Sequence, residues 1–223
     1  MNNAWLMRVR LLSGYTALML LCLRQWRSAE PWAHLDRFSG GYCLLAVLWF
    51  VTSSTFFGLD EHSPETMKEA SGASFDPTML KGIAVISVAE LLVLIDYADL
   101  HLLPGLKVLW LQYSGLILSF IGVTWLAWVD RYLVTYFKND SRMGLLDKGP
   151  YRFVRHPRYL ALAISRFSFA LIFASPIAWA FVILWVMLII RRIRLEEAHM
   201  RERFAEEYTA YSSHTARLLP GIY

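Results

Sequence analysis

Cysteine and charge are both scarce in this chain. The 223 residues include two cysteines, Cys22 and Cys43, which lie in apolar segments without metal-ligand spacing, so neither a disulfide framework nor redox chemistry is expected. Charged residues make up 18% of the sequence, below the roughly 25% of an average soluble domain. The formal net charge is only +4, and the basic residues lie beside apolar runs, which is typical of membrane proteins and not of nucleic-acid binding.

Several sequence signatures are also missing. No glycine-rich GxGxxG motif, internal repeat or low-complexity tract occurs. An acidic stretch at residues 58–78 is the only change of composition inside the chain, and we interpret it as a loop. The sequence therefore predicts a single domain.

Hydrophobic residues, in contrast, make up 57% of the chain, and the mean hydropathy is +0.40. Since a crossing helix needs about 20 residues, the apolar runs predict an all-α integral membrane protein with about six transmembrane helices. The runs are residues 11–23, 42–57, 79–103, 106–129, 159–174 and 177–190. Ser175 and Pro176 separate the last two, which we expect to form a C-terminal helical hairpin. No small-residue cleavage site follows the first run, which is therefore expected to be a retained span.

Basic residues cluster on both sides of the predicted hairpin, within residues 131–158 and 191–217. Because basic loops stay on the cytoplasmic side of a membrane, both clusters are expected there. An even number of spans then places the N-terminus on the same side. This leaves Arg24, Arg27 and Arg37 in an outside loop, against the same rule.

Two polar stretches flank the hairpin and should meet at one membrane face. The first, residues 149–159, reads GPYRFVRHPRY; Pro157 is expected to open a helix, and the preceding turn to leave backbone N–H groups unpaired for a polar ligand. The second, residues 192–197, reads RIRLEE and contains Arg192 and Glu196 at i, i+4 spacing. Residues 195–212 then predict a C-terminal amphipathic helix at the membrane interface.

Some charged residues within or beside the apolar runs have two interpretations. Glu90, Asp96, Asp99 and His101 lie along the third run and Arg166 lies in the fifth, at depths where charge is costly. These residues either line a substrate cavity, or mark the end of a span and extend toward the surface.

The two polar stretches, the apolar hairpin and the tail FAEEYTAYSSHTARLLPGIY together resemble the isoprenylcysteine carboxyl methyltransferase family. Phospholipid N-methyltransferases share this outline. The resemblance covers the chain from about residue 136 onward. It implies an S-adenosylmethionine-dependent membrane enzyme in which residues 1–130 form N-terminal transmembrane helices and residues 131–223 form the catalytic part of one membrane domain.

The resemblance also implies roles for individual residues. The cofactor would be held by Met143, Gly144, Leu145, Leu146, Tyr151, His156, Pro157, Arg158, Tyr159 and Glu197. The substrate-binding, catalytic pair would be Arg192 and Glu196. The chain departs from the family pattern at Ala161 and Ala205, where glycine is usual, and at His214, where arginine is usual. Taken alone, His156 would instead be interpreted as a helix cap.

The reaction expected from this resemblance is carboxyl O-methylation of a prenylcysteine or similar lipid-bearing acid that enters from the membrane, with the active site facing the cytoplasm. Membrane lipids are the other expected contacts, and no metal is required. Three alternatives stay open: a phospholipid N-methyltransferase, a nicotinamide-dependent enzyme resembling the sterol reductases, and a non-catalytic membrane scaffold. The acceptor and the oligomeric state do not follow from the sequence.

Overall fold

A computed structural model describes residues 37–58, 85, 88–97, 102, 106, 108–139, 144–219 and 221. The labelled elements are α2 (Arg37–Gly58), α5 (Leu109–Asn139), the 3-10 helix η3 (Gly149–Arg152), α6 (Pro157–Phe173) and α7 (Pro176–His214). Residues 88–97 are also helical. The described residues contain no β-strand, only an isolated parallel bridge between Val154 and Ala216, so the prediction of an all-α fold is confirmed for this part of the chain.

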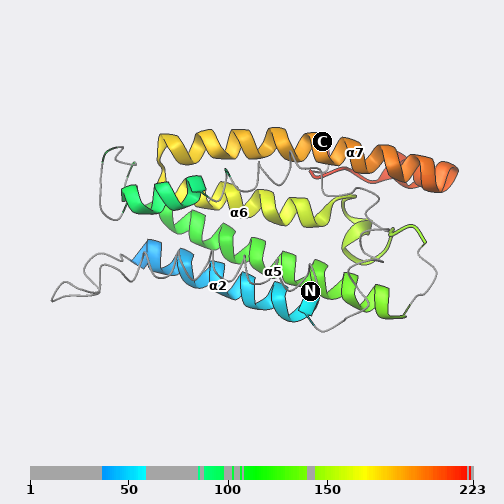
Figure 1. The fold of residues 1–223 in the computed structure, drawn as a ribbon, viewed down its shortest axis with the longest axis horizontal. Coiled ribbons are helices and arrows are strands. Elements are labelled where there is room, and N and C mark those ends of the chain that lie inside the picture. The colour runs from blue at the N-terminus through cyan, green and yellow to red at the C-terminus, as the bar shows by residue number, and fades with distance from the viewer. Residues whose placement is uncertain are drawn as a thin grey trace, which may run out of the picture.

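The long helices lie roughly along one direction, and α6 runs opposite to α5 and α7 (Figure 1). Pro157 is the first residue of α6, as predicted, because its fixed φ suits the first turn of a helix. At the other end, Ala174 adopts a left-handed conformation with φ of 43°, and its N–H donates to the Ala170 oxygen at 2.8 Å. Pro176 then opens α7. The chain therefore reverses within two residues, Ala174 and Ser175.

Glycine allows α5 to approach α6 closely. A Cβ atom on Gly115 would lie 2.7 Å from the Ile172 side chain and 2.9 Å from the Ser168 oxygen. A Cβ atom on Gly122, two turns further along, would lie 3.3 Å from the Ala161 oxygen. Small residues at such positions let helix backbones pack closely, as membrane bundles require.

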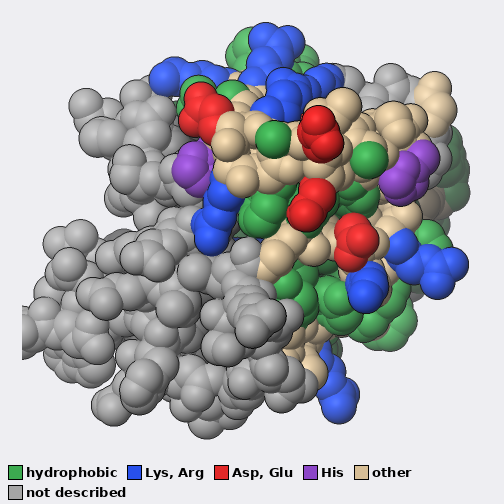
Figure 2. All heavy atoms as spheres, turned by 90° about the vertical axis from the view of Figure 1, so that its right-hand side faces the viewer, with side chains coloured by type: hydrophobic (Ala, Val, Ile, Leu, Met, Phe, Trp, Pro, Cys, Tyr) green, Lys and Arg blue, Asp and Glu red, His purple; other side chains and the backbone are tan. Residues whose placement is uncertain are grey.

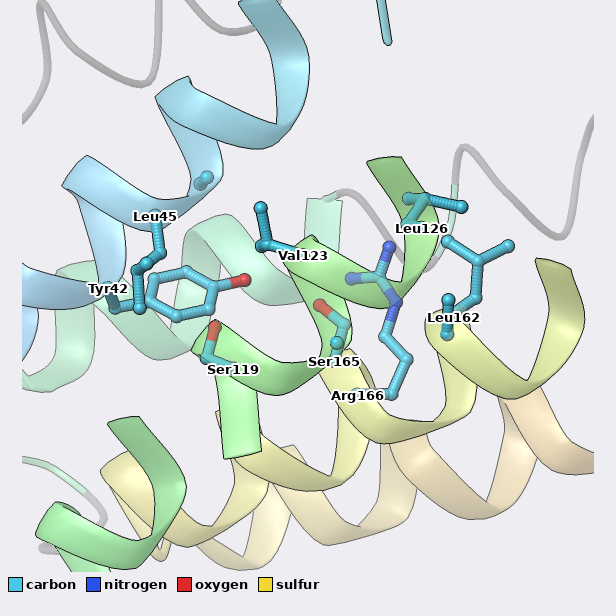
Figure 3. A pocket seen from close by; sticks show the side chains of 11 residues that line it. Tyr42, Leu45, Ser119, Val123, Leu126, Leu162, Ser165 and Arg166 are labelled. Atoms are coloured by element: carbon cyan, nitrogen blue, oxygen red, sulfur yellow. The ribbon is translucent and has the colours of Figure 1, made fainter. Parts of the chain in front are cut away.

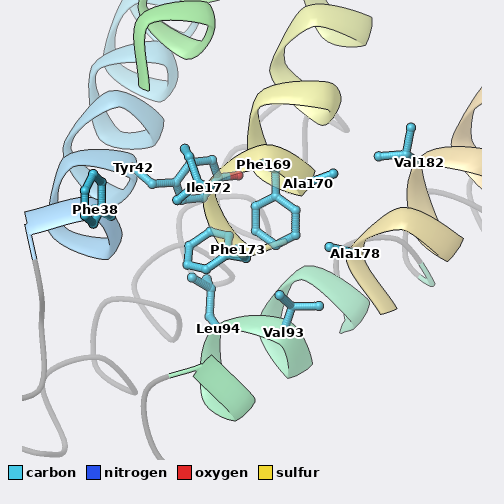
Figure 4. Close-up of a cluster of buried hydrophobic side chains, with 10 residues drawn as sticks. All are labelled: Phe38, Tyr42, Val93, Leu94, Phe169, Ala170, Ile172, Phe173, Ala178 and Val182. Carbon is cyan, nitrogen blue, oxygen red and sulfur yellow. The ribbon is translucent and has the colours of Figure 1, made fainter. Parts of the chain in front are cut away.

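A cluster of buried apolar side chains joins α2, residues 88–97, α6 and the start of α7 (Figure 4). Phe173 lies at its centre, with ring centroids of Phe169, Tyr97 and Tyr42 at 4.8, 5.0 and 5.6 Å. Edge-on and tilted aromatic pairs of this kind stabilise a packed core.

Two helices among the described residues are long and apolar enough to cross a membrane: Leu109–Tyr136, within α5, and Pro176–His214. Helix α6 has 17 residues, and the predicted first span, residues 11–23, lies outside the described residues. The count of six spans and the transmembrane hairpin therefore stay predictions. So does the division at residue 130, which falls inside α5.

The interfacial helix expected at residues 195–212 does not begin as a separate element at residue 195. Helix α7 runs on from its apolar half through Leu195, because no proline or glycine interrupts it there. It breaks instead at Ala205, whose φ of 38° and ψ of −106° are not helical. This is one of the two positions where alanine replaces the glycine usual in the resembling family.

Candidate active site

The polar residues singled out from the sequence gather at one end of the helix bundle. The last turns of α5, the short helix η3, the start of α6 and the charged half of α7 all reach this end (Figure 1). Basic, acidic and histidine side chains are concentrated on its surface (Figure 2). The reversal of the chain between α6 and α7 thus brings residues 149–159 and 192–197 together, as the sequence predicts.

Glu196 connects the two polar stretches. The hydroxyl of Tyr159, in the first turn of α6, donates to Glu196 Oε1 at 2.5 Å. Arg192 Nε donates to the same oxygen at 2.8 Å, so the expected i, i+4 pair is present. His156 Nδ1 lies 3.7 Å from Glu196 Oε2. Glu196 thereby fixes a phenol and a guanidinium at the edge of the apolar part of α7.

Glu197 is buried, with 1% of its side chain exposed, and it is surrounded by arginine. Arg155 approaches its Oε1 with Nε at 3.1 Å and Nη2 at 3.0 Å. Arg217 Nε lies 3.1 and 3.0 Å from its two oxygens, and Arg201 Nη2 lies 3.4 Å from Oε2. Paired guanidinium groups of this kind keep a buried carboxylate ionised. Glu197 therefore has a structural task in addition to its predicted role at the cofactor.

The C-terminal tail lies against the turn before α6. The N–H groups of Arg155 and His156 donate to the carbonyl oxygens of Ala216 at 2.8 Å and Arg217 at 3.1 Å. Arg155 Nη1 also donates to the oxygens of Ser212 and Thr215 at 2.6 and 2.9 Å. The expectation that this turn leaves its backbone N–H groups unpaired is therefore wrong at these two residues, because the tail satisfies them.

His156 lies at the start of α6, in the N-cap position, but does not cap it with its side chain, and its predicted role at the cofactor stays a prediction. Its ring stacks on Tyr159, with centroids 5.7 Å apart. The buried Nε2 lies 3.5 Å from Glu197 Oε1, and it makes no well-formed hydrogen bond to the described residues. The buried Tyr208 hydroxyl interacts with Glu197 but likewise makes no well-formed hydrogen bond in that part of the chain. Such groups require a partner, which a bound polar molecule can supply.

Pro157 and Arg158 attach the turn to α5. Trp125 Nε1 donates to the Pro157 oxygen at 2.9 Å, and Arg158 Nε lies 3.0 Å from Asp130 Oδ1. The Asp130 carboxylate is fully buried, whereas the Arg158 side chain is 46% exposed. In this structure Arg158 therefore holds α6 to α5, and its expected contact with a cofactor stays a prediction.

The other residues predicted to hold the cofactor lie in the segment that joins α5 to α6 along the chain. Tyr136 donates to the Gly144 oxygen at 3.3 Å, and Leu145 and Leu146 are partly buried. The Tyr211 hydroxyl donates to the Tyr151 oxygen at 2.6 Å. Burial raises the pKa of the Tyr151 phenol, with Arg158 opposing the shift, so this hydroxyl stays protonated. Met143 lies outside the described residues.

Four residues of the site had no role assigned from the sequence: Arg155, Arg217, Asp130 and Tyr208. Arg155 lies within the quoted motif GPYRFVRHPRY, and Arg217 lies within the quoted tail. Asp130 could have been identified from the sequence, because a carboxylate at the end of an apolar run needs a partner. The sequence does not show which arginine supplies it.

Comparison with known proteins shows which families the chain resembles. Residues 107–207 match the family model described as Phospholipid methyltransferase. The chain is also similar to Protein-S-isoprenylcysteine O-methyltransferase A of Arabidopsis thaliana, with 27% identity over 148 residues that cover 61% of this chain and 74% of the relative. The matched family segment contains α5, α6 and the charged half of α7 up to residue 207.

Proposed function

We propose that this chain methylates a lipid-bearing acid with S-adenosylmethionine as the methyl donor. The basis is the resemblance to the isoprenylcysteine and phospholipid methyltransferases, which both comparisons support. Both matches bear the name of a methyltransferase, which favours this activity over a nicotinamide-dependent reductase or a scaffold. The apolar helices agree with an enzyme embedded in a membrane.

The residues present suit the proposed donor. A molecule with an amino-acid end and a positively charged sulfur needs carboxylate, aromatic and hydrogen-bonding neighbours. Glu196, Tyr159 and His156 supply these groups within one cluster. His156 Nε2 and the Tyr208 hydroxyl, which interact with Glu197 but make no well-formed hydrogen bond among the described residues, are atoms to which such a molecule could bind. When bound, S-adenosylmethionine supplies an electrophilic methyl group that passes to an acceptor oxygen.

Arg192 carries the proposal for the acceptor. Its Nε donates to Glu196 Oε1 at 2.8 Å, and its guanidinium also interacts with the Tyr159 hydroxyl, which together use only part of its five N–H donors. The planar group can therefore present its remaining donors to a carboxylate, while Glu196 and Tyr159 hold it in place. A carboxylate is already ionised at neutral pH, so no base is needed. Positioning and exclusion of water are the contributions left to the protein.

The exposed Arg191 and Arg194 beside Arg192 favour an anionic acceptor over an amine. An amine would be attracted by Glu196 but repelled by Arg192. An amine lipid such as phosphatidylethanolamine, the substrate of a phospholipid N-methyltransferase, is therefore the second candidate acceptor and ranks below the lipid-bearing acid.

The chemical nature of the methylated product distinguishes the two candidate acceptors. The purified protein in lipid nanodiscs receives S-adenosylmethionine with a labelled methyl group, and either a farnesylated cysteine derivative or phosphatidylethanolamine. We expect a base-labile methyl ester from the first acceptor. A base-stable product formed only from the amine would overturn carboxyl methylation.

A pair of arginine variants tests the role of Arg192. Arg192→Lys keeps the charge but loses the planar fork, so turnover should fall at least about tenfold while cofactor affinity stays within about twofold. Arg194→Lys changes an exposed arginine two residues away and serves as the matched control. Equal turnover in both variants would remove Arg192 from the acceptor site.

A further inference from the structure

Two groups of charged side chains have no part in the described contacts of Glu196 and Glu197. The first is the pair of Arg166 and Glu90, in which Nη1 contacts Oε1 and the side chains are 20% and 18% exposed. Arg166 also lines a pocket between α2, α5 and α6 (Figure 3). The pocket measures about 20 Å³, room for about one water molecule, so it is not the substrate cavity considered from the sequence. This pair is a link between α6 and residues 88–97.

The second group combines an exposed arginine with exposed aromatic rings, where η3 ends. Arg152 is the last residue of η3, and its Cζ lies 5.0 Å from the centroid of the Phe153 ring. Phe153 is 49% exposed, and its ring packs against Trp128 and Trp125 of α5, with centroids at 6.1 and 6.4 Å. Trp125 is itself fixed, because its Nε1 donates to the Pro157 oxygen at 2.9 Å. These rings therefore hold Arg152 in a defined place at the surface.

The guanidinium of Arg152 is available for an anion. It makes no ion pair with a carboxylate among the described residues, whereas the nearby Arg158 is engaged by Asp130 at 3.0 Å. An arginine that lies over a ring keeps its N–H donors free at the edge of its plane. Arg131 is also exposed, and it follows Trp128 by three residues, which places it on the same face of α5. The group is therefore positively charged and rich in donors.

The position of this group along α5 indicates lipid headgroups as its partner. Trp128 lies in Leu109–Tyr136, the part of α5 that is long and apolar enough to cross a membrane, and it is eight residues from the end of that part. Tryptophan and arginine near the end of such a segment typically lie at the level of the headgroups. Trp128 is 42% exposed, so it and Phe153 can contact lipid chains while a guanidinium contacts the phosphate. A small soluble anion would leave these rings exposed.

We propose that Arg152, Phe153 and Trp128 form a binding site for the phosphate group of a membrane phospholipid. Arg152 donates to the phosphate oxygens, and Arg131 adds positive charge. The two rings pack against the glycerol and the first carbons of the lipid chains. The bound molecule is a lipid of the surrounding membrane and not the methyl acceptor, so this inference does not depend on the proposed function. Because Phe153 precedes His156 by three residues, the lipid holds the turn before α6 at the level of the headgroups.

Matched ligands test which part of a phospholipid is recognised. Native mass spectrometry measures binding to the full chain, delipidated in detergent, of dioleoyl phosphatidylglycerol and of dioleoylglycerol, which has the same chains without the phosphate. We expect the phospholipid to bind about fivefold more tightly, as one arginine beside an anionic headgroup provides. Glycerol phosphate, which lacks the chains, should not displace the phospholipid at equal concentration. Equal affinity for the two lipids, or displacement by glycerol phosphate, would overturn the proposal.

Variants test whether Arg152 is the cause. Arg152→Gln should remove the preference, and Phe153→Leu, which loses the ring beneath the guanidinium, should weaken phospholipid binding about two- to fivefold. Both side chains are exposed, so both variants should fold. The chain offers a matched control, because Arg203 Cζ lies 5.3 Å from the centroid of the Phe204 ring. The exposed Glu202 beside this second pair disfavours a phosphate, so Arg203→Gln should keep the preference.

Two results with these variants would overturn the assignment to Arg152. One is a preference for the phospholipid that survives in Arg152→Gln. The other is an equal loss in Arg152→Gln and Arg203→Gln, which would mean that the lipid responds to the charge of the whole chain and not to one site.

Discussion

Replacing Arg155 with glutamine should destabilise the protein more than any substitution of an exposed arginine. Arg155 joins three parts of the chain: the turn before α6, Glu197 on α7, and the carbonyl oxygens of Ser212 and Thr215 near the tail. Its side chain is 9% exposed, so water does not replace these contacts. The variant removes the donors to two carbonyl oxygens and one of the positive charges around a buried carboxylate.

The expected loss of stability depends on which contacts of Glu197 remain in the Arg155→Gln variant. Removing one partner of a buried ion pair typically costs about 3–5 kcal/mol. Arg217 still contacts both oxygens of Glu197 in the variant, at 3.1 and 3.0 Å, so we expect the lower limit of about 3 kcal/mol. For a chain of 223 residues, this corresponds to a fall in Tm of about 6–12 °C.

The assay is thermal unfolding in detergent, at one scan rate because membrane proteins often unfold irreversibly. Arg194→Gln is the matched control, since Arg194 is exposed on the same helix as Glu197, and its Tm should stay within about 2 °C. Glu197→Gln and the double variant complete a mutant cycle. Because glutamine needs no positive partner, the double variant should be less destabilised than the sum of the single ones.

Two results would refute this reasoning. One is a Tm for Arg155→Gln equal to that of Arg194→Gln. The other is strict additivity in the cycle, which would mean that Arg155 and Glu197 do not stabilise each other.

Three further expectations concern the backbone, the helix packing and the topology. Ala205→Gly should raise Tm by about 2–4 °C, because φ of 38° strains alanine by about 1 kcal/mol and suits glycine; an unchanged or lower Tm would contradict the kink. Gly115→Ala should cost about 1–3 kcal/mol, since its Cβ would lie 2.7 Å from Ile172, whereas Gly40→Ala, with nothing within 4 Å, should be neutral or stabilising. Equal unfolding curves for these two variants would exclude the close approach of α5 and α6. Single cysteines at the exposed Lys148 and Ser213, in a cysteine-free background, should react with an impermeant reagent from the same side of the membrane, and labelling from opposite sides would contradict a shared site.

Local sequence patterns predicted the parts of the site that depend on short spacing. Pro157 opens α6 because the ring of proline fixes φ, and this holds in any surroundings. The Arg192 and Glu196 contact follows from the helical repeat alone. The roles of these residues in binding a cofactor or an acceptor stay predictions.

Contacts between distant residues could not be predicted in the same way. Glu197 pairs with Arg155 and Arg217, which are 42 and 20 residues away, and the sequence offers many other arginines as partners. Arg158 lies against Asp130, and this contact depends on how α5 and α6 are rotated about their axes, which the sequence does not show. Its expected role at the cofactor stays a prediction. The break at Ala205 was hidden by a helical pattern that continues on both sides of it.

The contacts of the C-terminal tail have a consequence for the order of folding. Arg155 binds Ser212 and Thr215 across 57 and 60 residues, and the whole of α6 and most of α7 lie between them. Closing so long a loop in an unfolded chain is entropically costly, but pairing α6 with α7 first brings the two ends close together. We therefore expect the tail to dock after the two helices have paired, and the candidate active site to be among the last parts of the described structure to form.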